Sequence, residues 1–191
     1  MLLALESNVR SFEALVGHFA FARSGVEMPA IEEGGRAERS DMSTVLATAP
    51  VIREVMAKAG DDPAQVPPHV RALVEQVLEM ASYAGAALFV LPPEDPQDKD
   101  WRSAGQRMME VMRGELADPA AAIGDVRALE LLARSAGGGG EDFGRQLEEF
   151  GQRVGERAAA RGEGRMVGME AGYYRSGWML RSLVMFLLAF L

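Results

Sequence analysis

Two histidines, His18 and His69, are the only imidazole side chains in this chain of 191 residues, and there is no cysteine. Histidine and thiolate ligands are the usual means of holding zinc, haem and iron–sulfur groups. Neither histidine follows a glutamate by three residues, which is the spacing that di-iron helical bundles require. We therefore expect no metal site and no cofactor. The alternative that the sequence leaves open is a haem or another small molecule held through His69, which follows Pro67 and Pro68.

Four consecutive glycines, 137–140, precede a segment that is predicted to be helical. Phosphate-binding loops combine such glycines with lysine and serine or threonine at a helix N-terminus free of negative charge. Here Glu141 and Asp142 occupy that position, so we interpret the run as a linker. Because the chain also lacks a Gly-x-Ser-x-Gly elbow and a Ser-x-x-Lys pair, the sequence favours a protein that is not an enzyme.

The net charge is −8 and the sequence pI is about 4.9. Binding to duplex DNA requires an excess of Lys and Arg to neutralise phosphate, so we expect no nucleic-acid partner. Lys58 and Lys99 are the only lysines among 20 basic residues, an arginine bias that is typical of a GC-rich bacterial genome. Along the sequence the arginines form no cluster that would indicate an anion site.

Apolar residues recur at three- and four-residue spacing through most of the first 136 residues, and no segment alternates with a period of two. We predict an all-α bundle of five or six helices in residues 1–136, without strands. The expected helices cover 3–23, 42–59 with a break at Pro50, 68–91, about 100–113, and 119–136, and 25–39 is expected to be a long acidic loop. The predicted core consists of Phe12, Leu15, Phe19, Leu46, Ile52, Leu73, Val77, Leu88, Phe89, Met108, Met112, Leu129 and Leu132.

Residues 141–191 form a separate C-terminal helical segment in this prediction. Phe143, Leu147, Phe150 and Val154 follow one another at intervals of four, three and four, which predicts a long helix with a narrow apolar stripe. Gly151 and Gly155 are four residues apart, a spacing that allows close approach of a second helix. We therefore expect a helical interaction or adaptor protein, most readily a homo-oligomer. A hairpin formed with the terminal apolar residues of the same chain is the alternative.

The run from Trp178 to Leu191 is apolar except for Arg181 and Ser182, and it includes Met185. Methionine and tryptophan are common at apolar binding surfaces, so both residues are assigned to the predicted interaction surface. A helix of this length spans about 21 Å, less than the ~30 Å of a bilayer core. We expect the run to dock on protein, and attachment of the chain to a membrane surface is the alternative. The predicted location is the cytoplasm.

Overall fold

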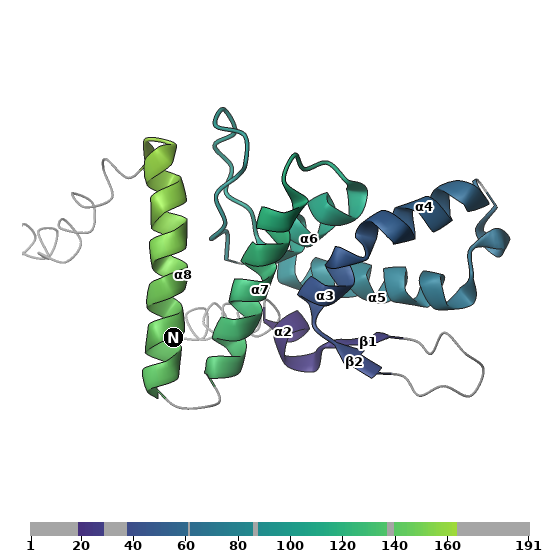
Figure 1. Ribbon diagram of the computed structural model, residues 1–191, viewed down its shortest axis with the longest axis horizontal. Helices are drawn as coiled ribbons and strands as arrows, with labels where there is room; N and C mark the ends of the chain where they lie inside the picture. Colours follow the sequence, from purple (N-terminus) through teal and green to yellow (C-terminus); the bar gives the residue numbers. More distant parts are fainter. Residues whose placement is uncertain (1–18, 29–37, 61, 86–87, 137–139, 164–191) are drawn as a thin grey trace, which may run out of the picture. The chain divides into compact units, whose positions relative to one another are not determined.

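The computed structural model describes residues 19–28, 38–60, 62–85, 88–136 and 140–163 (Figure 1). It divides into two compact units, 1–150 and 151–191. The described elements are mainly helical, which confirms the all-α class. The helices are α2 (Ala20–Ser24), α3 (Met42–Ala47), α4 (Ala49–Ala59), α5 (Pro68–Gly85), α6 (Ala104–Arg113), α7 (Pro119–Ser135) and α8 (Gly140–Ala160), with one 3₁₀ turn at Pro63–Gln65.

One expectation was wrong, because a small antiparallel sheet lies within the predicted acidic loop. Strand β1 (Val26–Met28) pairs with β2 (Glu38–Ser40), with Val26 opposite Ser40. Three residues are too few for alternation to be visible in a sequence, and Val26 alone of β1 is fully buried. Gly25 has φ of 64°, and a Cβ there would lie 3.2 Å from the Ser40 carbonyl oxygen, so the entry to β1 favours glycine.

Proline and glycine lie at the ends of the helices largely as the sequence predicts. The helix expected over 42–59 is interrupted at Thr48, and Pro50 lies in the first turn of α4, where a missing N–H is tolerated. Gly60, with φ of 61°, ends α4. The Asp118 side chain accepts a hydrogen bond from the Ala121 N–H at 3.1 Å and caps α7, with Pro119 at its first position.

The helix predicted over 68–91 ends earlier, at Gly85. Leu88 has φ of 52°, which is incompatible with a continuing right-handed helix, and Leu91 pairs with Arg102 as an extended bridge. Leu91 precedes a proline, and the proline ring disfavours helical backbone in the residue before it. As a result Phe89, predicted to be in the core, is 53% exposed. The helix expected from about residue 100 begins later, at Ala104, and is capped by Ser103 through a reciprocal capping box with Gln106.

The core lies between α5, α6 and α7, with α3 and α2 packed on α7. Most predicted core positions within the described residues are buried or pack against the core, whereas Phe12 and Leu15 lie outside those residues. Buried as predicted are Leu46, Ile52, Leu73, Val77, Met108, Leu129 and Leu132, and Phe19 and Met112 are partly buried. Helices α5 and α6 approach closely at Gly105, where an added Cβ would lie 2.0 Å from the Ala81 carbonyl oxygen of α5.

Candidate functional site

Helix α8 carries most of the predicted interaction residues. Three of them, Phe143, Phe150 and Val154, are half-buried, and Phe150 packs against the hydrophobic core. Leu147 differs, because 47% of this leucine is exposed. Glu141 and Asp142 lie in the first turn, where negative charge favours the helix dipole, and Asp142 forms an ion pair with Arg145.

A second face of α8 carries three glycines. At about 100° per residue, Gly144, Gly151 and Gly155 lie on the same side of the helix as Leu147 and next to the phenylalanine stripe. A Cβ added at any of these three glycines would meet no other atom within 4 Å. We name Gly144, Leu147, Gly151 and Gly155 the α8 glycine face. Of the residues predicted for interaction, Phe150 therefore contacts the core, while those of the α8 glycine face are exposed.

The remaining predicted interaction residues, Trp178 and Met185, lie outside the described residues, and so do the predicted hairpin and the predicted membrane-attachment segment. None of the described helices is both long and apolar enough to cross a membrane. His18 also lies outside the described residues. His69 is in the first turn of α5 and is partly buried.

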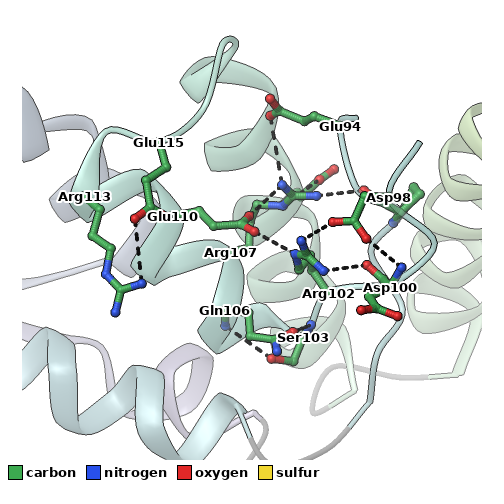
Figure 2. Close-up of polar contacts among 12 residues, drawn as sticks. Glu94, Asp98, Asp100, Arg102, Ser103, Gln106, Arg107, Glu110, Arg113 and Glu115 are labelled. Carbon is green, nitrogen blue, oxygen red and sulfur yellow. Dashed lines mark hydrogen bonds and ion pairs between the residues drawn. The ribbon is translucent and has the colours of Figure 1, made fainter. Parts of the chain in front are cut away.

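A cluster of charged side chains that the sequence analysis missed lies on α6 and the segment before it (Figure 2). Arg107 is only 1% exposed. Its Nη1 donates a hydrogen bond to Glu110 Oε2 at 2.8 Å, and its Nη2 donates to the Pro92 carbonyl oxygen at 2.7 Å. Its Nε lies 3.9 Å from Asp125 Oδ2 of α7. The guanidinium thus joins α6, α7 and the start of the 92–103 segment.

Arg102 binds the other oxygen of the same carboxylate. Its Nε donates to Glu110 Oε1 at 2.7 Å, its Nη1 donates to the Asp100 carbonyl oxygen at 2.7 Å, and its Nη2 donates to Asp98. The hydrogen bond to Glu110 is the main reason why the pKa of Arg102 is raised above its ordinary value. Glu110 therefore bridges two arginines, and the 92–103 segment is held on α6 through charge-assisted bonds.

These charges border an open cleft of about 470 Å³, lined among others by Glu94, Asp95, Asp98, Arg102, Arg107 and Glu110. The carboxylates outnumber the guanidinium groups, so the cleft does not favour a phosphate or another anion. Within the described residues, no group of three or more histidine and carboxylate side chains is placed to hold a metal ion. The arrangement positions a loop, and we assign it no chemistry on a substrate.

A second buried carboxylate, Glu130 of α7, is bound at the start of α3. It accepts hydrogen bonds from the Ser43 N–H at 3.2 Å and from the Ser43 hydroxyl at 2.6 Å. Beside it, Arg134 Nη2 donates to Asp41 Oδ2 at 3.1 Å. The carboxylate satisfies an N–H at a helix N-terminus, which has no partner within the helix. Ser43 and Glu130 are 87 residues apart, and no local pattern in the sequence relates them.

No protein family, curated protein or solved structure matches this chain. The α8 glycine face combines exposed glycines, an exposed apolar side chain at Leu147 and open space around its three glycines.

Proposed function

We propose that this protein is a helical interaction protein that packs the α8 glycine face against a helix of another protein chain. The observation that supports the proposal is the open space around Gly144, Gly151 and Gly155, in which an added Cβ would meet nothing. A helix presenting glycines in this way allows a second backbone to come closer than larger side chains permit.

The conformational cost of these glycines also supports the proposal. Each glycine within a helix is less favourable than alanine by about 1 kcal/mol, because its backbone loses more freedom on folding. At an exposed position that contacts no other residue, alanine would stabilise the isolated helix more than glycine does. Three such positions on one face, next to the exposed Leu147, are explained if the face is covered in the functional state.

Photo-cross-linking of the full chain in cells tests the proposal. A photoreactive amino acid replaces Leu147, and in a second variant it replaces Val51 of α4, an apolar residue that is more exposed, at 63%. We expect irradiation to give an adduct heavier than the 20.6 kDa chain from position 147 and not from position 51. Adding Gly151→Leu should abolish that adduct, because the leucine fills the space for the partner. The absence of any adduct at 147, or one that Gly151→Leu leaves unchanged, would show that the proposal is wrong.

A further inference from the structure

We infer that a cavity lined by α2, β2 and α7 binds a small ligand that carries a phosphoryl group. The cavity has a volume of about 380 Å³, which is in the range of pockets that hold small molecules. Its lining comes from three parts of the chain, namely residues 22, 23 and 25 at the end of α2, 39–41 at the end of β2, and 133–134 near the end of α7. No residue of the α8 glycine face lines the cavity, so the inference is independent of the proposed function.

Three arginines and one carboxylate line this cavity. Arg23 comes from the last turn of α2, Arg39 from β2 and Arg134 from the last turn of α7. Asp41 is the carboxylate, so the lining carries a formal charge of 3 − 1 = +2, whereas the whole chain carries −8. A hollow lined by one sign of charge attracts ligands of the opposite sign. The fold thus gathers arginines that form no cluster along the sequence.

The three guanidinium groups differ in the acceptors that they already have. Arg134 Nη2 donates a hydrogen bond to Asp41 Oδ2 at 3.1 Å. Arg39 Nη2 lies 3.7 Å from Glu27 Oε1, in an ion pair whose two side chains are mostly exposed, and such pairs contribute little to stability. The exposed guanidinium of Arg23 forms no hydrogen bond or ion pair with the described residues. Arg23 and Arg39 therefore have donors for a further acceptor.

The chemistry of these groups selects the class of ligand. A guanidinium group presents a planar fork of N–H donors that fits the oxygens of a carboxylate or a phosphate. A carboxylate carries one negative charge, whereas a phosphate monoester carries about 1.5 to 2 negative charges at pH 7 and has three acceptor oxygens. The phosphoryl group therefore matches both the +2 charge of the lining and its three arginines.

The helix ends do not by themselves account for this gathering of positive charge. A basic side chain in the last turn of a helix interacts favourably with the helix dipole, which is a sufficient reason for Arg23 and for Arg134. Arg39 lies on a strand, where this reason does not apply. A bound dianion would neutralise all three arginines at once.

Isothermal titration calorimetry of the full chain with inorganic phosphate, glycerol phosphate and acetate, at constant ionic strength, tests the inference. We expect the phosphoryl probes to bind about tenfold more tightly than acetate, because they carry more charge and more acceptors. Whichever of the two phosphoryl probes binds more tightly identifies the ligand as a phosphate monoester or as the free ion. If neither binds at millimolar concentrations, or if acetate binds equally well, the inference is wrong.

Two double variants of equal charge locate the site. Arg23→Gln/Arg39→Gln removes the two arginines with donors for a ligand, and Arg113→Gln/Arg127→Gln removes two exposed arginines that do not line the cavity. Circular dichroism checks that both variants keep their helical content. We expect phosphate affinity to fall about tenfold or more in the first variant and by less than about twofold in the control. An equal loss in both, or no loss in the first, would overturn the inference.

Discussion

Gly105 of α6 lies so close to the Ala81 carbonyl of α5 that a Cβ would approach its oxygen to 2.0 Å, and the Gly85 nitrogen to 2.5 Å. Both neighbours are backbone atoms of one helix, so neither can move aside as a flexible side chain would. The crossing of the two helices therefore depends on the absence of a side chain at residue 105. It is the tightest approach among the glycines of the described residues.

We predict that Gly105→Ala lowers the free energy of unfolding by about 1–3 kcal/mol or more, because the methyl group forces α5 and α6 apart. Gly124→Ala in α7 is the matched control. A Cβ there meets nothing within 4 Å, so the higher helix propensity of alanine should stabilise by up to about 1 kcal/mol. Urea denaturation followed by circular dichroism measures both. Equal effects of the two substitutions would contradict the packing described for Gly105.

The bond between Ser43 and Glu130 gives a second prediction. Ser43→Ala removes the 2.6 Å hydrogen bond from a carboxylate that is 1% exposed, and we expect a loss of about 1.5–3 kcal/mol of stability. Ser82→Ala, at an exposed position of α5, should change stability by less than about 0.5 kcal/mol. In a double-mutant cycle, Glu130→Gln should cost much less in the Ser43→Ala background than in the wild type. Strict additivity would show that the two side chains are not coupled.

Arg107 is predicted to be the most sensitive of the charged residues in Figure 2. Arg107→Met leaves the buried Asp125 and the oxygens of Glu110 and Pro92 without this guanidinium, and we expect a loss of about 3–5 kcal/mol. Arg113→Met, at a largely exposed position of the same helix, should cost less than about 0.5 kcal/mol. Chemical denaturation compares the two variants. A loss for Arg107→Met no larger than that of the control would contradict the role of Arg107 in holding α6, α7 and the 92–103 segment together.

The raised pKa of Arg102 makes a prediction about alkaline pH. A basic group whose pKa is raised on folding contributes stability that is fully present below its unfolded value and is lost as the pH rises through the folded value. Because the ordinary pKa of arginine already lies well above moderately alkaline pH, Arg102→Gln should lower the free energy of unfolding by the same amount at neutral and at moderately alkaline pH. Denaturation curves of the wild type and of Arg102→Gln at the two pH values give the difference in their free energies of unfolding. If this difference in free energy fell between neutral and moderately alkaline pH, the raised pKa of Arg102 would be contradicted.

The α8 glycines should affect stability and association in opposite directions. In the double variant Gly144→Ala/Gly151→Ala, each alanine should favour the isolated helix by up to about 1 kcal/mol. The added methyl groups should also keep a partner helix at a distance and weaken association. Gly124→Ala provides the control, because it should stabilise without changing association. Sedimentation equilibrium and urea denaturation together measure the two effects, and a double variant that associates as well as the wild type would argue against close packing at this face.

The sequence by itself determined the helices and where most of them end. Spacing of three and four residues predicts Leu46, Ile52, Leu73, Val77 and Met108 on buried faces, because an amphipathic helix must bury its apolar side. Pro119 with Asp118, and Gly60, set helix ends through local backbone chemistry that requires no partner elsewhere in the chain. These features depend on residues within one or two turns of one another, so they can be recognised in the sequence alone.

Only the tertiary structure decided the contacts between residues that are far apart in the sequence. Ser43 meets Glu130 across 87 residues, and Arg107 reaches Asp125 of α7 and the Pro92 carbonyl, so neither buried charge was predictable from its neighbours in sequence. The same holds for Gly105, whose need for glycine comes from α5. The apolar stripe of α8 was predicted, but the structure separates Phe150, which packs on the core, from the exposed Leu147 and its neighbouring glycines. Periodicity identifies an apolar face, whereas the packing of the other helices decides which part of that face stays exposed.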